Sequence, residues 1–246
     1  MEKMFYATGG YMRLDSWVMA NLIQLGTQSF CQRFVTRQHD PCGRQYDQMT
    51  QAARSCVANI AEGTSRHQTS RETELKLLDV ARASLAELAG DYVNFLLFSE
   101  KVPWEKNSPS MRQMYEVRLD VASYTSSDWI HESSNHILQQ EKKFDIWLKS
   151  DDAEVVANVL LMMISRVISM LNHQLEITIR DFKDNGGFRE QLTQIRQAAQ
   201  ASGSQSPSCP ECGGPMRRRV ATRGIYEGKE FWSCSSFPKC RGFRPI

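Results

Sequence analysis

Proline and net charge are both scarce in this sequence of 246 residues. Only three of its eight prolines precede residue 201, so the first 200 residues can form long helices, whereas the proline-rich last 46 cannot. The net charge is only +2, but residues 1–200 carry 22 Lys and Arg against 25 Asp and Glu, and residues 201–246 carry 8 against 3. The low total therefore conceals two segments of opposite sign. The length and the 41% hydrophobic content exclude a disordered tail and fit one ordinary domain plus a small module.

The sequence also lacks long apolar runs and a secretory signal. Its longest apolar run, 155–171, is interrupted by polar residues and falls short of the roughly 20 apolar residues that a membrane span needs. Residues 1–10 lack the basic region followed by an apolar stretch that marks a signal peptide. The seven cysteines are an odd number, which argues against a complete disulfide framework. We therefore expect a soluble, cytoplasmic protein in a reducing compartment, with no membrane partner.

Apolar residues recur at helical spacing through most of the first 200 residues. Between Leu78 and Phe95 they are separated by alternating steps of three and four, which predicts the seam of an antiparallel bundle. Gly63 is expected to cap the second helix, and Thr69 with Glu72 forms a capping-box signature for the third. The expected helices cover about 14–34, 45–62, 69–95, 108–123, 129–148 and 152–184, with a short one at 189–200.

The helix expected at 152–184 has more apolar residues than one core-facing stripe requires. Of the 17 residues from Val155 to Leu171, 13 are apolar. Either this helix is central in a monomer, or another subunit covers its second face. Because four helices around one core leave no fully enclosed position, we favour a homo-oligomer formed through the bundle.

Four of the cysteines form two pairs in the tail, Cys209 with Cys212 and Cys234 with Cys240, with 21 residues between the pairs. Two disulfides or four unrelated thiols are the alternatives, but both spacings and the expected reducing compartment favour one zinc ion held by all four. Four thiolates leave no open coordination position, so this zinc would be structural. A module of this size cannot bury a sufficient core without such a clamp.

The expected fold class is therefore mainly α with a small β module. Residues 1–200 form an antiparallel four-helix bundle with a helical insertion at about 104–150, and residues 201–208 have the composition of a flexible linker. Residues 209–246 form a C4 zinc ribbon, because the span between the cysteine pairs has the apolar and glycine pattern of short strands.

Basic and aromatic residues are interleaved around the cysteines. Cationic side chains neutralise phosphates and exposed aromatic rings stack on unpaired bases, which favours binding of single-stranded DNA or RNA. The alternative is that the aromatic residues form the module's minimal core and the arginines are merely solvated. We expect at least one of Tyr226, Phe231, Trp232 and Phe237 to be exposed. The candidate binding residues are Arg217, Arg218, Arg219, Arg223, Tyr226, Phe231, Trp232, Phe237, Lys239 and Arg241.

Two segments of the tail resemble a known module. Residues Cys209 to Met216 (CPECGGPM) and Phe231 to Cys240 (FWSCSSFPKC) are similar to the C4 zinc-finger repeats at the C-termini of bacterial type IA DNA topoisomerases. The resemblance covers about the last 40 residues and includes all four cysteines. It implies single-stranded DNA binding, and nothing of a topoisomerase catalytic core is present.

The helical part resembles a second family. Residues 52–63 (AARSCVANIAEG), 69–74 (TSRETE) and 81–88 (ARASLAEL) are similar to the four-helix-bundle proteins of 23S rRNA intervening sequences, and more closely to their relative, the four-helix-bundle suffix domain. Relatives include the accessory variability determinant of diversity-generating retroelements, a basic pentameric bundle that associates with a reverse transcriptase. The resemblance implies such an enzyme as a partner. The bundle here is not basic, so the nucleic-acid-binding role is expected in the tail.

No catalytic constellation is visible in the sequence. His131 and His136 are five residues apart, whereas a zinc-protease helix needs histidines four apart, and no phosphate-binding glycine loop or nucleophile elbow occurs. We therefore predict a non-enzymatic nucleic-acid-binding adaptor, an oligomeric bundle with tethered zinc ribbons. The alternative is a protein-interaction scaffold whose bundle and ribbon both bind protein partners.

Overall fold

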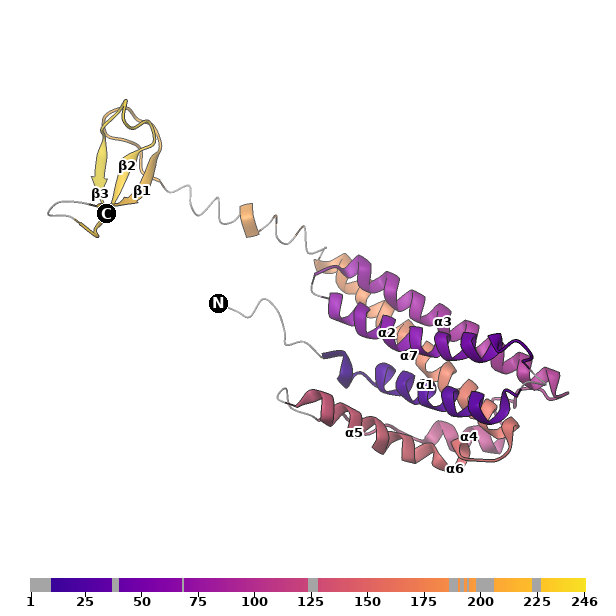
Figure 1. Ribbon diagram of the computed structural model, residues 1–246. Coiled ribbons are helices and arrows are strands. Elements are labelled where there is room, and N and C mark those ends of the chain that lie inside the picture. Colours follow the sequence, from indigo (N-terminus) through magenta and orange to yellow (C-terminus); the bar gives the residue numbers. More distant parts are fainter. Residues whose placement is uncertain are drawn as a thin grey trace. The chain divides into compact units, whose positions relative to one another are not determined.

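The chain divides into two compact units, 1–188 and 189–246, in the computed structural model. We call them the helical unit and the cysteine unit and describe each by itself. The predicted fold class is confirmed, because the first is built of helices and the second of a small antiparallel sheet (Figure 1). The linker expected at 201–208 and the short helix at 189–200 lie largely outside the described residues. The structure describes residues 10–36, 40–67, 69–123, 128–185, 190, 193, 195–197, 206–222 and 227–246.

Four long helices enclose the core of the helical unit. Helix α1 packs against α2 and α7, and α3 also packs against α2 and α7, so each helix has two neighbours (Figure 1). The short connections from α1 to α2 and from α2 to α3 reverse the chain direction, as in antiparallel neighbours. A short 3-10 helix, η1 (Gly10–Arg13), precedes them. Their bounds are α1 Asp15–Phe34, α2 Arg44–Arg66, α3 Arg71–Phe98 and α7 Ala153–Asn185.

The seam predicted on the third helix is confirmed in α3. Its central residues are completely buried, and the hydroxyl of Tyr92 donates a 2.9 Å hydrogen bond to Thr27 Oγ1 of α1. The ring of Phe30 packs edge-on against Tyr92, with 5.0 Å between centroids. The seam residues, all buried, are Leu78, Ala81, Leu85, Leu88, Tyr92 and Phe95.

Two predicted helix ends are wrong. Helix α2 continues through Gly63 to Arg66, so Gly63 does not cap it. A Cβ at Gly63 would lie 3.2 Å from the Cβ of Leu77, which means that the glycine permits the close approach of α2 and α3. The N-cap of α3 is Ser70, whose hydroxyl accepts from the N–H of Thr73 at 3.3 Å, because the residue before it still belongs to the turn.

The insertion between α3 and α7 consists of short helices that cover α1 and α7. The helices α4 and α6 pack against α7, and α5 packs against α1. Arg33 of α1 donates to the backbone carbonyl of Leu148, 3.0 Å away, and to that of Ser150. The helix expected at 108–123 ends earlier, and the one expected at 129–148 is broken into three. The bounds are α4 Pro109–Glu116, α5 Trp129–Glu141, η2 Lys142–Phe144 and α6 Asp145–Leu148.

Helix α7 is central within a single chain. It is long and apolar enough to cross a membrane by length and composition, contrary to our expectation, yet 56% of its most apolar window is buried inside the protein. Both α1 and α3 pack against it, and the insertion supplies the additional cover that four helices alone would lack. Its apolar excess therefore no longer argues for a second subunit, and oligomerisation stays a prediction without that support. The buried apolar residues are Val156, Ala157, Val159, Leu160, Met162, Met163, Ile164, Val167 and Leu171.

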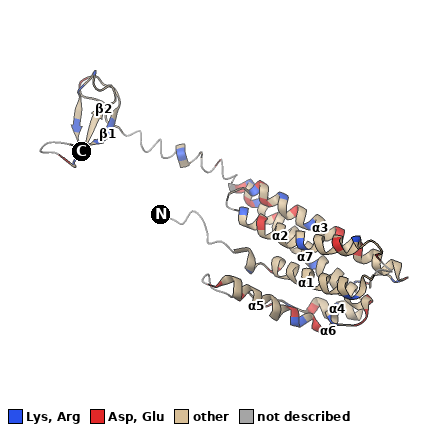
Figure 2. Cartoon of the chain, viewed as in Figure 1, with Lys and Arg blue, Asp and Glu red and all other residues tan. Residues whose placement is uncertain are grey.

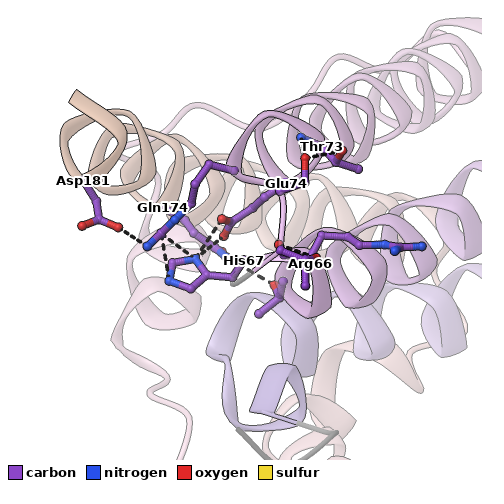
Figure 3. A network of polar contacts seen from close by, with 10 residues as sticks. Arg66, His67, Thr73, Glu74, Gln174 and Asp181 are labelled. Carbon is purple, nitrogen blue, oxygen red and sulfur yellow. Dashed lines mark hydrogen bonds and ion pairs between the residues drawn. The ribbon is translucent and has the colours of Figure 1, made fainter. Parts of the chain in front are cut away.

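A polar network ties the turn between α2 and α3 to the last turns of α7 (Figure 3). The carboxylate of Glu74 is buried, and His67 Nδ1 lies 2.8 and 3.0 Å from its two oxygens. Arg71 lies against the imidazole of His67 and forms an ion pair with Asp181 of α7. The network compensates a buried negative charge, which would otherwise destabilise this end of the unit.

The cysteine unit contains a three-stranded antiparallel sheet in the order β1-β2-β3. The strands are β1 Met216–Val220, β2 Glu230–Cys234 and β3 Phe243–Pro245. Its small core consists of Cys209, Met216 and Cys234, with Trp232 and Cys240 packed against it. A core of this size holds a fold of its own only with a further clamp.

Candidate metal centre and the adjoining sheet

The sulfur atoms of all four tail cysteines lie within 4.8 Å of one another. Cys209 Sγ is 3.6 Å from Cys240 Sγ, and Cys212 Sγ is 3.5 Å from Cys234 Sγ. Each of these pairs joins a cysteine of the first motif to one of the second. The four thiols can therefore hold one metal ion together, and all seven cysteines of the chain are free of disulfides.

Tight turns place the two motifs. In the first, the N–H of Cys209 donates to the carbonyl of Gly214 at 2.8 Å, and the N–H of Gly213 donates to the carbonyl of Cys209 at 2.9 Å. Gly213 has a φ of +70°, a conformation that residues with a Cβ rarely adopt. In the second motif, Cys234 ends β2 and the N–H of Ser236 donates to its sulfur at 3.4 Å.

Backbone N–H groups also face the other sulfurs. The pKa of Cys209 is lowered to about 7, chiefly by the N–H of Cys212 and also by that of Glu211. The N–H groups of Gly214 and Gly242 act on Cys212 and Cys240 in the same sense, but neighbouring thiols together with burial outweigh them. The pKa of Cys212 is therefore raised, and that of Cys240 is raised to about 12. Donors aimed at a sulfur stabilise its thiolate, which is the form that binds a metal.

Gly242 is a functional residue that the sequence analysis missed. A Cβ at this position would lie 2.2 Å from Cys209 Sγ, a distance that no packing can accommodate. The N–H of Cys234 also donates to the carbonyl of Gly242 at 3.0 Å, so this residue joins both motifs. Its place two residues after the last cysteine was the available signal.

The pleat of the sheet divides the predicted binding residues between two faces. Residues paired across antiparallel strands point to the same side. Arg217 of β1 lies opposite Ser233 of β2, which in turn lies opposite Phe243 of β3. Arg219 of β1 lies opposite Phe231 of β2. We call the face with Arg217, Arg219, Phe231 and Phe243 the Arg/Phe face. Phe243, 64% exposed, was absent from the predicted set.

The opposite face carries Arg218 and Trp232, which pair across β1 and β2. Arg218 forms an ion pair with Glu230, and Trp232 packs against the core of the unit. These two predicted residues thus have partners within the unit. By contrast, neither Arg217 nor Arg219 forms an ion pair with any acidic residue in the described part of the chain.

The remaining predicted residues lie in the turns. Phe237 is 52% exposed, which confirms the expectation that at least one of the named aromatic residues faces solvent. The guanidinium carbon of Arg219 lies 6.0 Å from the Phe237 ring centroid, at the limit of a cation–π contact. Lys239 and Arg241 are exposed. Arg223 and Tyr226 lie outside the described residues.

The helical unit shows no comparable concentration of one charge among its described residues. Figure 2 shows Lys and Arg interspersed with Asp and Glu along its helices. Many of these charges form ion pairs on the surface, such as Lys76 with Glu72 and Lys149 with Asp145. By contrast, β1 of the cysteine unit carries three consecutive arginines.

Comparison of the chain with protein-family models, with curated proteins and with solved structures returned no match. The two resemblances given under Sequence analysis therefore stay predictions.

Proposed function

We propose that Cys209, Cys212, Cys234 and Cys240 hold one structural zinc ion. Four sulfurs about 2.3 Å from a tetrahedral zinc lie about 3.8 Å from one another. The two sulfur pairs at 3.5 and 3.6 Å are already close to that spacing. Four thiolates complete the shell, so the ion would clamp the fold of the cysteine unit and leave no position for a reacting water.

We further propose that the Arg/Phe face binds single-stranded nucleic acid, DNA or RNA, and that the protein is a non-enzymatic adaptor. This proposal depends on the placement of Arg217 and Arg219, which form no ion pair among the described residues, on one face with the half-buried Phe231 and the exposed Phe243. The guanidinium groups would neutralise phosphates. The rings would stack on bases, which are accessible only in an unpaired strand.

The net positive charge favours nucleic-acid binding by the cysteine unit. That charge is small, so a single unit would bind a strand weakly. The segment 201–246 has a formal charge of about +5, which four thiolates and one Zn²⁺ reduce to about +3. Affinity would then depend on several tails acting together, or on a partner that already holds the strand. The helical unit is proposed to supply this through self-association or through a protein partner. The resemblance suggests a nucleic-acid enzyme such as a reverse transcriptase as that partner.

The proposal is tested by fluorescence anisotropy with labelled single-stranded DNA, single-stranded RNA and duplex DNA. We expect salt-sensitive binding to the single strands, and loss of that binding on deletion of residues 201–246. Metal analysis of the purified chain should give one zinc per chain. Unchanged affinity after the deletion contradicts the proposal. Absence of binding at physiological salt, together with co-purification of a specific protein, would instead favour the protein-interaction scaffold.

A further inference from the structure

The four cysteines of the metal centre differ in exposure. Cys209 and Cys234 are buried, Cys240 is partly buried and Cys212 is exposed. Cys212 is therefore the sulfur that a small solute reaches first. Its neighbour Cys234, 3.5 Å away, is 1% exposed and ends the central strand β2.

We propose that Cys212 and Cys234 form a peroxide-sensitive pair, whose oxidation to a disulfide releases the metal and opens the cysteine unit. This inference rests on the proposed zinc site. It adds a regulatory property that the site does not need for its structural role. The proposed reactant is hydrogen peroxide, a small oxidant of the kind that an exposed thiolate meets directly.

The chemistry balances with one peroxide for each disulfide. The thiolate of Cys212 attacks one peroxide oxygen, the O–O bond breaks, and the products are a sulfenic acid and hydroxide. The thiolate of Cys234 then attacks the sulfenic sulfur, forms the S–S bond and displaces a second hydroxide. Two sulfurs lose one electron each and peroxide gains both. A metal left with two of its four thiolates is no longer held in a closed shell.

The other three cysteines compete poorly for this reaction. Burial raises the pKa of Cys31 and of Cys56 to about 12, so neither supplies a thiolate near neutral pH. Cys42 is exposed, but its unit contains only these two other cysteines, and both are buried in the core. A sulfenic acid at Cys42 would therefore lack an accessible thiol in its own unit.

Oxidation of the cysteine pair would disturb the Arg/Phe face through β2. This strand pairs with both β1 and β3, and it carries Phe231 of the Arg/Phe face. The disulfide would draw the turn of Cys212 toward the end of β2, because two sulfurs 3.5 Å apart must approach to about 2 Å. Loss of the clamp would remove the alignment of the three strands, and reduction with zinc present would restore it.

The test uses the full-length, zinc-loaded chain, with zinc content measured first. One equivalent of hydrogen peroxide is added, zinc release is followed with a chromogenic chelator, and disulfides are mapped by mass spectrometry. We expect release approaching one zinc per chain, a Cys212–Cys234 disulfide, and recovery with dithiothreitol and zinc. Cys42→Ser, the matched control for an exposed thiol, should release zinc to the same extent.

Three results would overturn the proposal. These are zinc retained while the peroxide is consumed, a Cys209–Cys212 disulfide as the first product, or release that requires Cys42. A chain that contains no zinc before peroxide is added contradicts the zinc site itself. A chain that holds zinc and retains it contradicts only the redox pair, so the two failures are distinguishable.

Discussion

The division of the sheet into two faces predicts that neighbouring arginines contribute unequally to binding. Arg217 and Arg219 lie on the Arg/Phe face, whereas Arg218 lies on the opposite face and is paired with Glu230. Each phosphate contact to a single strand contributes about 0.7 to the slope of log K against log salt. Loss of two contacts in Arg217→Ala/Arg219→Ala should therefore lower that slope by about 1.4. The slope multiplies the logarithm of the salt concentration, so the loss of affinity depends on salt. The double substitution should lower affinity about 25-fold more at 0.1 M salt than at 1 M salt.

The assay is fluorescence anisotropy with a labelled single strand between 0.05 and about 0.3 M salt, a range in which the slope is well defined. Arg218→Ala is the matched control, because it removes the same charge from the adjacent position. We expect its slope to change by less than half as much as that of Arg217→Ala. Equal effects of the two single substitutions would refute the assignment of the faces. No effect of any of them would refute the binding site.

Further predictions concern the rings, the metal and the core. Phe243→Ala should weaken binding by about 1–3 kcal/mol, the usual worth of one base–ring stack, with an unchanged salt slope in the same assay. Gly242→Ala should weaken zinc binding by roughly 10- to 100-fold in a chelator competition, because its Cβ would meet the sulfur of Cys209. Gly214→Ala is the control and should change zinc affinity less, because its Cβ would make only an ordinary 3.5 Å contact with the sulfur of Cys212. Zinc affinity should rise with pH from about 7 upward, because Cys209 loses its proton near its pKa of about 7, while the raised pKa values of Cys212 and Cys240 keep protons competing at higher pH. A flat profile between pH 6 and 8 would contradict this. Tyr92→Phe should lower the free energy of unfolding by about 1–2 kcal/mol in urea, because it leaves a buried threonine hydroxyl without its donor. Light scattering at micromolar concentration tests oligomerisation, and a mass of 28.2 kDa would reject it.

The long helices were predictable because their apolar spacing repeats over many turns. The seam of α3 and the existence of α1, α2 and α7 follow directly from it. Helix ends were less predictable, because they depend on single contacts. In the sequence Gly63 has the position of a helix C-cap. In the structure a glycine is needed there because Leu77 of α3 approaches closely.

What covers α7 could not be predicted from periodicity. The count of apolar residues showed that a second face needed burial, yet a subunit and an insertion satisfy that need equally well. Only the packing of α4 and α6 decides between them for this surface. The weak amphipathic pattern of the insertion gave no indication of where it would dock.

The cysteine set was predictable because a tetrahedral shell requires four donors at short spacing. The binding face was not predictable. Three consecutive arginines on β1 occupy both faces of the strand, so the sequence does not show which of them point away from the core. Their assignment depends on the ladder, which pairs the middle arginine with Trp232 and thereby turns the other two away from the core.

The position of α7 at the end of the helical unit has a consequence for synthesis of the chain. Helices α2 and α3 adjoin each other in sequence and can pair as soon as residue 98 has emerged. Helix α1 can also pair early with α2, but its other side must wait, because its hydrogen bond to the end of the insertion joins residues 115 positions apart. A nascent chain would therefore expose the side of α1 that packs against α7 until α7 is complete, and a chaperone or a second nascent copy would meet that side during this interval. The cysteine unit is separate from these helices, so its folding would depend on binding of the proposed metal and not on completion of α7.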